Sequence, residues 1–480
     1  MRREEDEGLD MTAPGTRPSR LRREQLISSY SRRGRPMSHH RALKASGLIA
    51  VAAILSLACG GSSGGGGNGG SKGEIDIGVD LPMSGGEASN GVPTLNGVNF
   101  AVKQQNDKGG VKGYTIKVTS LDDAVNGKHD PQKGAQNVQQ LLASSKVLAM
   151  VGPFNSNVAA AEIPVANRDS LSMISPANTN PCLTKQVSQD FGGCQNYAGY
   201  DPGSLRPTGT NNYFRVAGTD DHQGPANADN AYNQLKITKV AVGDDAEAYG
   251  KGIAQTFIAQ FKKLGGQVVL PLQDFDPNTT NDFRTFLRSA QNAGAQGIYF
   301  GGTDSNKACI VRSQMKGIFP DTAPFMGGDG IVTVQCLTDA ATAAPGMYGT
   351  TATKDADQVP DARATIDAFH KQYTGNIDYG SYTIPGYACA QLIMNAIGKA
   401  IDANNGSMPT RKQVLEQLGK TSNFGSVLGP VTFDKNGDNS QQIMSLYKSE
   451  AVDSSKKYLE TTDNKQVGWI FVSAKDYSTS

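Results

Sequence analysis

Polar residues follow a stretch of the chain that has the pattern of a buried strand, where they could bind a small anion. Residues 147–151 form a short apolar run, and Asn155 and Ser156 come next, just before a helical stretch at 158–168. Free backbone N–H groups at the start of a helix, together with a serine hydroxyl, suit a carboxylate. Plain capping of the helix by Asn155 or Ser156 accounts for the same residues, so both interpretations stay open.

A second loop of this kind follows the next predicted strand, at residues 171–174. It contains Ala177, Asn178 and Thr179, which supply a hydroxyl group and backbone groups. The carboxyl ends of parallel strands lie at one edge of a sheet, so this loop would lie beside the first one. A loop rich in proline and asparagine, without any ligand, explains these residues as well.

Two candidates in the second half of the chain could bind a cation or an apolar group. Residues 327–330 (Gly-Gly-Asp-Gly) follow a predicted strand, where the glycines would let a ligand approach the backbone and Asp329 would offer a carboxylate. The alternative is a turn with a local contact of the Asp329 side chain. Tyr249 follows another predicted strand and would either cover an apolar ligand or pack on the next helix.

Alternating strand and helix patterns would position these residues. Apolar residues alternate with polar ones from 75 to 81, as in a strand, and then recur at helical spacing. Two successive series of this type predict an α/β fold with two doubly wound parallel-sheet lobes. Strands are expected at 75–81, 114–121, 147–151, 171–174, 237–242, 268–272, 297–300, 324–326 and 443–447. Helices are expected at 96–107, 132–143, 158–168, 250–264, 282–293, 306–318, 362–373 and 387–401, and Thr410 with Gln413 forms a capping-box signal for one more.

Charge and composition argue against several classes of protein. Residues 1–58 carry 11 of the 46 Lys and Arg residues and 6 of the 45 Asp and Glu residues, so the remaining 422 residues have a net charge of −4. They hold no basic block of the size that favours nucleic acid as a partner. No CxxC pair, His/Cys cluster, nucleophile elbow or catalytic Ser/His/Asp order is present. We therefore expect no metal, no cofactor and no enzymatic activity.

Five cysteines follow the N-terminal region, and an oxidising compartment would permit disulfides. Cys182 and Cys194 flank a polar, glycine-containing loop and are expected to pair. Cys309 and Cys336 could form a second disulfide. Cys389 lies in an amphipathic helical stretch and is expected to be a buried thiol.

The N-terminal region has the features of an export signal with a site for lipid attachment. An apolar stretch at 48–57 is too short to span a bilayer, and it ends just before Cys59 and an almost pure glycine and serine tract. This resembles bacterial lipoprotein signal peptides, in which the cysteine becomes the lipid-bearing first residue. Residues 1–58 would be a signal peptide, whose true start would be Met37, and 59–73 a lipidated tether. An ordinary cleaved signal with a chance cysteine is the alternative.

Short motifs in a fixed order resemble those of a known family. They are residues 82–85 (PMSG), 97–102 (GVNFAV), 151–153 (VGP), 173–181 (MISPANTNP), 214–215 (FR), 249–250 (YG), 325–330 (FMGGDG) and 429–434 (GPVTFD). From residue 75 onward the chain resembles the type I periplasmic binding proteins of the leucine/isoleucine/valine-binding kind. The resemblance implies two lobes that close over a small ligand. Lobe 1 would comprise 74–217 and 353–428, lobe 2 would comprise 218–352 and 429–480, and a three-strand hinge would lie near 214–218, 350–353 and 427–433.

The resemblance also implies roles for the candidate residues. In the family, a serine and an alanine/threonine loop hold the α-carboxylate of an amino acid, at positions that match Ser156, Ala177 and Thr179. The backbone at Ala177 and an acid that matches Asp329 hold the α-ammonium group. Tyr249 matches an aromatic lid residue.

This chain departs from the family pattern in ways that make the expected pocket more polar. Asn90 stands where tyrosine is frequent, Asp329 where glutamate is frequent, and Asn155 where small or apolar residues are common. Thr303 and Asp304 occupy another position that is often aromatic. These departures concern the side chain of the ligand more than its amino-acid headgroup.

We therefore expect an exported, lipid-anchored solute-binding protein on the outer face of the cytoplasmic membrane. It would act as a monomer and deliver an amino acid, branched-chain or more polar, or a similar small amphoteric ligand, to the permease subunits of an ABC importer. A ligand sensor on the same fold, coupled to a receptor, is one alternative. A protein that binds an amide, urea or a small carboxylate is another.

Overall fold

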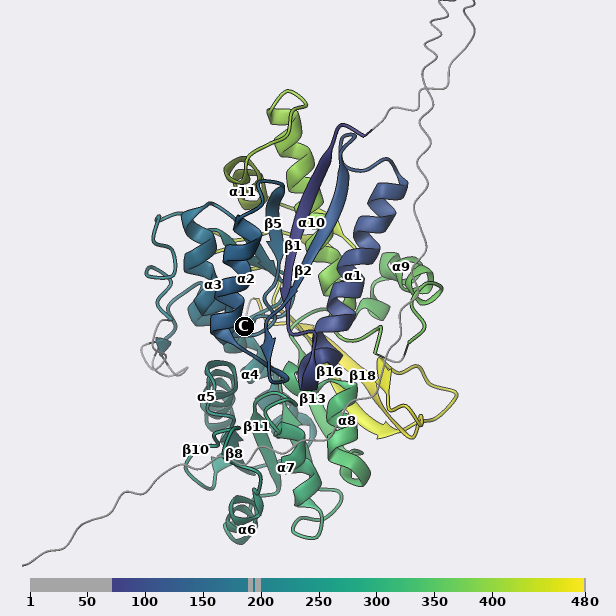
Figure 1. Ribbon diagram of the computed structural model, residues 1–480. Helices are drawn as coiled ribbons and strands as arrows, with labels where there is room; N and C mark the ends of the chain where they lie inside the picture. The colour runs from purple at the N-terminus through teal and green to yellow at the C-terminus, as the bar shows by residue number, and fades with distance from the viewer. Residues whose placement is uncertain (1–70, 189–192, 195–199, 376, 479–480) are drawn as a thin grey trace, which may run out of the picture. The chain divides into compact units, whose positions relative to one another are not determined.

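Five parallel strands form the first sheet, in the order β2-β1-β5-β6-β7 (Figure 1). They are β1 (Glu74–Leu81), β2 (Thr115–Asp122), β5 (Val147–Val151), β6 (Ser172–Ser175) and β7 (Tyr213–Arg215). The computed structural model describes residues 71–188, 193–194, 200–375 and 377–478. The strand order reverses at β1, which has β2 on one side and β5 on the other. Open parallel sheets bind ligands at such a reversal, beyond the carboxyl ends of the strands.

The predicted export signal lies outside the described residues, as do Met37, Cys59 and the tether up to residue 70. Ser71 is the first described residue, and its hydroxyl donates to the Gly73 carbonyl (2.8 Å) just ahead of β1. Within the described part of the chain, no helix is both long enough and apolar enough to cross a membrane.

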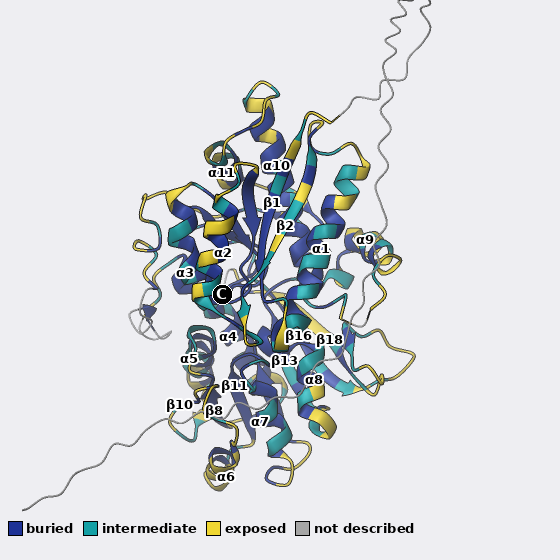
Figure 2. Ribbon diagram, viewed as in Figure 1, coloured by how far each residue is buried: buried dark blue, intermediate teal, exposed yellow. Residues whose placement is uncertain are grey.

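Helices cover both faces of the first sheet, and this explains why β5 is buried along its whole length (Figure 2). Leu148 and Val151 belong to a core with α1 (Ala88–Asp107) and α10 (Thr383–Ala403). Val147 and Met150 belong to a second core with α2 (Pro131–Leu142) and α3 (Ser156–Arg168). A strand buried on both faces reads as a continuous apolar run, which is the pattern that the sequence has here. Two more helices, α9 (Pro360–His370) and α11 (Arg411–Gly419), pack on the side of α10.

A second sheet of nine strands contains the rest of the predicted parallel series. β8, β11, β12 and β13 run parallel, and β16 and β18 extend the sheet with antiparallel pairings. The strands are β8 (Lys239–Asp244), β9 (Gln267–Val268), β10 (Gln273–Asp274), β11 (Gly297–Gly301), β12 (Phe325–Gly327), β13 (Met347–Thr351), β16 (Ile443–Ala451), β17 (Glu460–Thr461) and β18 (Val467–Asp476). The α/β fold class predicted from the sequence is confirmed.

The second sheet is also covered on both faces. On one face, Phe257 and Phe261 of α5 (Ala248–Lys263) pack with Tyr299 of β11, and the rings of Phe257 and Tyr299 stack with centroids 3.8 Å apart. α4 (Asp220–Asp229) packs against α5. The other face carries α6 (Arg284–Asn292), α7 (Ala308–Met315) and α8 (Val334–Ala340). The remaining strands are short hairpins: β3 (Ala124–Val125) with β4 (Lys128–His129), and β14 (Phe424–Ser426) with β15 (Gly429–Val431).

Most predicted elements occur within a few residues of their expected positions. The predicted strand at 147–151 coincides with β5, and the Thr410 capping box is present at the start of α11. The strand expected at 268–272 is wrong in extent: Pro271 has no N–H for a ladder, and the chain pairs with β8 only on either side of it, as β9 and β10.

Two helices differ from the prediction. In each, a glycine allows close packing against a neighbouring segment, and this packing outweighs the weak helix signal in the sequence. α1 begins at Ala88 rather than at 96, and a Cβ on its Gly91 would lie 2.1 Å from the Pro82 carbonyl. α4 was not predicted, since Gly224 and Pro225 interrupt its pattern. A Cβ at Gly224 would lie 2.0 Å from the Thr256 hydroxyl in α5, so glycine is what lets these two helices meet.

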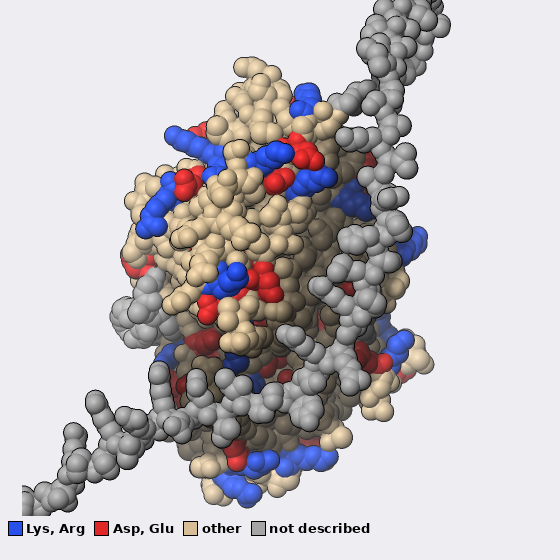
Figure 3. All heavy atoms as spheres, in the orientation of Figure 1, with Lys and Arg blue, Asp and Glu red and all other residues tan. Residues whose placement is uncertain are grey.

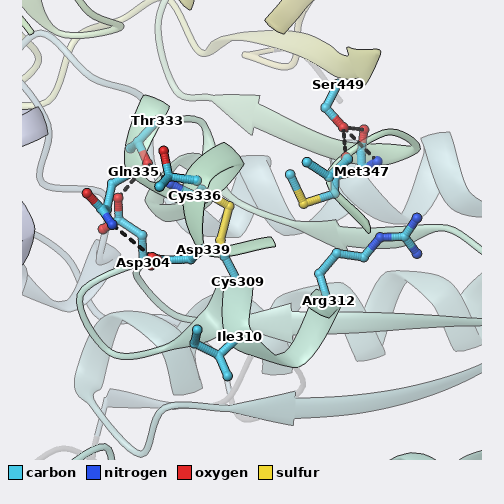
Figure 4. The surroundings of a disulfide bond; sticks show 12 residues. Asp304, Cys309, Ile310, Arg312, Thr333, Gln335, Cys336, Asp339, Met347 and Ser449 are labelled. Carbon is cyan, nitrogen blue, oxygen red and sulfur yellow. Dashed lines mark hydrogen bonds between the residues drawn. A yellow bond between two sulfur atoms is a disulfide. The ribbon is translucent and has the colours of Figure 1, made fainter. Parts of the chain in front are cut away.

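Both expected disulfides are present. Cys182 pairs with Cys194, and Cys309 of α7 pairs with Cys336 of α8, with Cα atoms 5.4 and 5.2 Å apart. Figure 4 shows the second disulfide beside Asp304, Thr333 and Gln335. Cys389 is a free, buried thiol in α10, as expected.

Three chain segments lie side by side between the two sheets: the first at Val216 and Gly218, the second at Ala352 and the third near Asn439. The Gly218 N–H donates to the Ala352 carbonyl (2.7 Å), and a cavity of about 20 Å³ is lined by Val216, Ala352 and residues near Asn439. Val431 and Phe433 pack into the core of the first sheet, although the predicted lobe boundary stands at 428. The third segment therefore leaves the first sheet nearer to 439 than to 429.

Exposed charges of both signs are intermixed on the face that Figure 3 presents. Several of them form ion pairs at the surface, such as Lys103 with Asp107 (2.6 Å) and Lys112 with Asp402 (2.8 Å). Pairs as exposed as these contribute about 0–1 kcal/mol each to stability.

A buried arginine ties the end of the first sheet to the third connecting segment. Arg215 in β7 has no exposed surface, and its Nε lies 2.7 Å from Oδ1 of Asp438. Its other nitrogens donate to the Thr184 hydroxyl (2.6 Å) and to the Asn178 and Asn180 carbonyls (3.2 and 2.8 Å). One guanidinium group therefore holds both the loop after β6 and the chain near 438.

We predict that Asp438→Asn destabilises the fold, because it leaves the Arg215 charge buried without its partner. Breaking a buried ion pair costs about 3–5 kcal/mol, whereas the exposed Asp107→Asn control should cost about 1 kcal/mol or less. The free energy of unfolding from urea titration measures both. Equal, small effects in the two variants would contradict a structural role for the Arg215–Asp438 pair.

Candidate functional site

Two loops at the carboxyl edge of the first sheet are hydrogen-bonded to each other. The Ser175 hydroxyl, at the end of β6, donates to the Pro153 carbonyl (2.7 Å) and accepts from the Asn178 N–H (2.9 Å). The Asn178 amide donates to the Phe154 carbonyl (2.6 Å) and accepts from the Tyr213 hydroxyl (2.7 Å). Asn178 was predicted to contact a ligand, but its side chain is engaged at both its nitrogen and its oxygen, in holding the loops together.

The other residues predicted on these loops lie beside one another. Ser156 begins α3, and its hydroxyl accepts from the Asn180 N–H (3.4 Å). Ala177 is buried next to them. Oδ1 of Asn155 and the Thr179 hydroxyl are buried too, and neither has a hydrogen-bond partner in the described part of the chain. Buried polar atoms are nearly always hydrogen-bonded, so these two are available to a ligand.

Asp329 is held by two tyrosines from different parts of the chain. Tyr249, at the start of α5, donates to Oδ1 of Asp329 (2.9 Å), and Tyr382, just before α10, donates to Oδ2 (2.6 Å). Tyr382 belongs to the core of the first sheet and meets Phe154 edge-to-face at 4.9 Å. Burial, and then the charge of Asp329, raises the pKa values of both tyrosines well above normal, so both hydroxyls remain donors.

The glycines around Asp329 make room for protein rather than for a ligand, which corrects our expectation. A Cβ at Gly328 would lie 2.6 Å from the Tyr249 hydroxyl, and a Cβ at Gly330 would lie 2.5 Å from the Gly302 carbonyl. The Gly330 N–H also donates to the Tyr249 hydroxyl (3.0 Å). Small residues are needed here because Tyr249 packs directly on the backbone in order to reach Asp329.

A second buried carboxylate, Asp220, stands near Asp329 and was not predicted. Asp220 is the first residue of α4, and its N–H donates to the Thr179 carbonyl (2.8 Å), which places it against the loop after β6. It has no exposed surface. Neither oxygen of its carboxylate makes a hydrogen bond of good geometry among the residues that the structure describes, although the Thr179 hydroxyl lies close enough to lower the pKa of Asp220 slightly against the effect of burial. Two acids, two tyrosine hydroxyls and the free Thr179 hydroxyl therefore converge from both sheets.

No basic side chain in the described part of the chain forms an ion pair with this cluster, and the Arg215 charge offsets the rise in the pKa of Asp220 only in part. Burial, and then the charge of Asp329, raises the pKa of Asp220 well above its normal range. Burial also raises the pKa of Asp329, against the opposing effect of the hydrogen bonds from Tyr382 and Tyr249. A positively charged group placed between the two acids would favour their ionised forms and recover the cost of burying them.

Thr303 belongs to a separate hydrogen-bond network that also joins the two sheets. Its hydroxyl lies 3.0 Å from the Ser305 hydroxyl, which in turn donates to Oε1 of Glu87. The same Glu87 oxygen lies 2.7 Å from Nδ1 of His129, whose Nε2 lies 2.8 Å from Oε2 of Glu247. Glu87 and His129 belong to the segments around the first sheet, and Ser305 and Glu247 to loops of the second.

His129 is positively charged in this network. Burial by itself lowers the pKa of His129, but Glu87 and Glu247 more than offset this effect and hold that pKa well above normal. Burial likewise raises the pKa of Glu87, yet the His129 charge outweighs it and the net shift is downward. Asn155 lies beside Glu87, so this network borders the residues of the first loop.

Asn90 is placed in the first turn of α1, where its carbonyl accepts from the Thr94 hydroxyl (2.7 Å). It is buried, with 6% of its surface exposed. No bond joins it to the cluster around Asp329 within the described residues, so its predicted role remains a prediction.

Sequence reasoning missed Asp220, Tyr382 and His129. Thr219 followed by two acids is a helix-start signal that could have identified Asp220, but the helix behind it was not recognised. Tyr382 and His129 carried no such signal: Tyr382 is 53 positions from Asp329, and His129 is 118 from Glu247. Only the folded chain brings them together.

Comparison with known proteins agrees with the fold described above. The family model described as "Periplasmic binding protein" matches residues 74–456. An amino acid binding protein of Pseudomonas aeruginosa is 30% identical over 368 residues, which are 76% of this chain and 87% of that protein.

Solved structures agree on the fold. The crystal structure of a leucine binding protein from Thermotoga maritima covers 85% of this chain and all of its own, with a TM-score of 0.66 and 24% identity. A solute binding protein of an ABC transporter from R. palustris, crystallised with 4-hydroxybenzoate, covers 84% of this chain and 97% of its own, with a TM-score of 0.65 and 20% identity. The two-sheet fold, the joined loops and the match over most of the chain lead to one conclusion: this chain belongs to the periplasmic binding protein family.

Proposed function

We propose that this chain is the solute-binding protein of an ABC importer and that it binds an α-amino acid between two lobes. Asp220 is the observation that carries the proposal. Its carboxylate is buried and unpartnered, and it stands beside a second buried acid, Asp329. An α-ammonium group supplies the positive charge and the three donors that these two acids lack.

Asp329 has enough acceptor sites to bind the ammonium group while it accepts from both tyrosines. A carboxylate offers about four lone-pair sites, and the hydroxyls of Tyr249 and Tyr382 use one on each oxygen. Each oxygen can therefore accept one further hydrogen bond. The tyrosines fix the orientation of the carboxylate, while Asp220 remains free to accept from the ligand with both oxygens.

The α-carboxylate of the ligand would lie toward the joined loops of the first sheet. Ser156 stands at the N-terminus of α3, where the helix dipole favours an anion, and the buried Thr179 hydroxyl beside Asp220 is a further donor. The Thr179 carbonyl accepts from the Asp220 N–H, so one backbone hydrogen bond joins the segments that would hold the two charged ends of the ligand.

The side chain of the ligand would meet a surface with both apolar and polar groups. The rings of Phe154 and Tyr382 provide the apolar part, and Asn155 with its free Oδ1 and Thr303 provide polar groups. We therefore retain branched-chain and more polar amino acids as candidates. A ligand without an ammonium group, such as an amide, urea or a small carboxylate, would leave Asp220 and Asp329 uncompensated.

Closure of two lobes would assemble the site. We assign residues 74–217 and 353 to about 438 to lobe 1, and 218–352 with the remainder to lobe 2. Tyr382 and Thr179 then act from lobe 1, and Asp329, Tyr249 and Asp220 from lobe 2. A ligand that touches both lobes shifts the equilibrium toward the closed state by its differential affinity for that state.

We further propose export and attachment of the monomeric chain to the outer face of the cytoplasmic membrane through Cys59. The family is one of extracytoplasmic binding proteins, which supports the location. The apolar stretch before Cys59 and the glycine-rich tract after it support the lipid anchor. Labelling of the chain by a palmitate analogue, lost in Cys59→Ala, tests the anchor.

The first prediction concerns ligand affinity. Asp220→Asn and Asp329→Ala should each cost about 2–5 kcal/mol of binding free energy for the amino acid that raises the melting temperature of the unaltered chain. Asp229→Asn, on the same helix as Asp220, is the matched control and should bind normally. Isothermal titration calorimetry measures all three. Unchanged affinity in both site variants, or preferential binding of 4-hydroxybenzoate by the unaltered chain, would refute the amino-acid proposal.

The second prediction concerns the release of a proton on ligand binding. In the free protein the raised pKa of Asp220 keeps a proton on that carboxyl at pH values where an ordinary aspartate is ionised. Binding of the ammonium group ionises Asp220, so affinity should rise as pH rises through this elevated pKa, and binding should release a proton. The test compares binding enthalpies in buffers with different ionisation enthalpies. The same proton release in Asp220→Asn would show that the proton comes from another group.

The third prediction concerns closure. Glu247→Gln removes the negative partner that lobe 2 gives to the buried His129 charge, and Asn157 also donates to Glu247 (3.3 Å). Loss of a hydrogen bond to a charged group should weaken ligand binding by about 1.5–3 kcal/mol. Asp274→Asn, which breaks the exposed pair with Lys251, is the control and should have little effect. Normal ligand affinity in Glu247→Gln would show that this hydrogen-bond network does not contribute to closure of the lobes.

A further inference from the structure

Three buried carboxylates from three different elements meet inside the first sheet and its helices. Asp80 belongs to β1, Asp123 directly follows β2, and Glu162 belongs to α3. None of the three has any exposed surface. One oxygen of each lies within 4.8 Å of an oxygen of both others. None of these residues takes part in the amino-acid site proposed above.

The three acids have almost no partners in the protein. Asn137 of α2 donates from its amide to Oδ1 of Asp80 (2.7 Å). Both oxygens of Asp123, both of Glu162 and Oδ2 of Asp80 have no hydrogen-bond partner among the described residues. Asp123 is thus a fully buried, unpartnered side chain directed at the two other carboxylates.

Elsewhere this chain supplies a cation to acids that are buried as deeply. Asp438 is paired with Arg215, and Glu87 is paired with His129. No ion pair joins a basic side chain to the three acids within the described residues: the charges of Lys133 and His129 act on Asp80 and Asp123 only as minor effects, and Asp80 and Glu162 contact each other. Burial is accordingly the main cause that raises the pKa of Asp80 to about 7 and those of Asp123 and Glu162 well above normal. Without a bound cation the three acids would have to retain protons.

The packing leaves room for Glu162 to reach the other two acids. A Cβ on Gly134 of α2 would lie 2.7 Å from Oε1 of Glu162 and 2.5 Å from Cγ1 of Val158. Gly134 and Asn137 are three residues apart, so they share the face of α2 that is turned to α3. The close approach of these helices therefore serves to bring the Glu162 carboxylate under the ends of β1 and β2.

The donor set and its spacing fit a hard divalent cation. Calcium binds oxygen ligands at about 2.3–2.6 Å, so two oxygens on one calcium ion lie no more than about 5 Å apart, and the 4.8 Å limit of this triad falls within that span. Magnesium demands near-ideal octahedral geometry at about 2.0–2.1 Å, whereas calcium accepts the flexible geometry that three carboxylates from separate segments provide. Zinc prefers nitrogen and sulfur ligands, and the triad supplies neither.

We infer that Asp80, Asp123 and Glu162 form a binding site for a divalent cation, and that calcium fits it best. The cation would neutralise the buried acids and tie the ends of β1 and β2 to α3. Because α3 begins at Ser156, the site would also stabilise the helix that presents its N-terminus to the proposed ligand carboxylate.

The test is titration of the purified full chain, first stripped with a chelator, with CaCl₂, MgCl₂ or MnCl₂ alone and without amino acid. We expect one calcium ion per chain, a rise in melting temperature, and a preference for calcium over magnesium. Titration to about 10 mM covers the 10⁻⁴–10⁻³ M range of weak extracellular calcium modules. Absence of saturable binding of all three cations would overturn the inference and leave a cluster that holds protons.

Two variants and a control locate the site. Asp123→Asn and Glu162→Gln keep the shape of each side chain but remove one negative charge, so calcium affinity should fall by at least about tenfold. The exposed Asp282→Asn should bind calcium normally. Equal affinity in the unaltered chain and in both triad variants would place the bound ion elsewhere and overturn the inference. If a variant fails to fold, the titration of the unaltered chain alone still decides.

Discussion

A carboxylate removed from water needs a positive partner or a proton, and much of this structure follows from how each buried acid meets that need. Asp438 is paired with Arg215, which connects the end of β7, the loop after β6 and the third connecting segment. Glu87 is paired with His129, which reaches Glu247 across the two sheets. In both cases the ion pair joins parts of the chain that are far apart in sequence. Charge compensation is therefore also what fixes the relative positions of the segments around the site.

Asp220 and Asp329 are the acids for which the protein supplies only neutral partners. Tyrosine hydroxyls orient Asp329, and the donor closest to the Asp220 carboxyl is the Thr179 hydroxyl. In an enzyme, carboxyl groups with such raised pKa values could transfer protons. In a binding protein, the positive charge of a ligand can instead stabilise their ionised forms. In the function we propose, the ammonium group of the ligand is the partner that these acids lack, so binding would draw both sheets together. The hydrogen bonds of Ser175 and Asn178 fix the loops that would meet the ligand relative to each other.

The acids in the first sheet obey the same constraint in a different way. Asp80, Asp123 and Glu162 lie behind the loops rather than on them, and a small ion suits their spacing better than an organic cation. The two clusters would then be neutralised by different agents, one transported and one structural. Such a division lets the binding site remain empty of counter-charge between rounds of transport while the sheet that carries it stays intact.

The sequence by itself determined the fold class, most of the strands and helices, and the loops that carry Asn155, Ser156, Ala177 and Thr179. These features depend on local patterns: apolar periodicity, capping residues and the turn residues after each strand. It also indicated both disulfides. The structure alone decided the partners of Asp329, because Tyr382 lies 53 positions away and approaches only when α10 packs on the first sheet. It alone decided that Asn178 positions the loops and that the glycines beside Asp329 make room for Tyr249. A helix-start signal could have located Asp220, but the tertiary structure alone decided that Asp220, Asp80, Asp123 and Glu162 are buried without a positively charged partner, because burial and partners depend on neighbours that are distant in sequence.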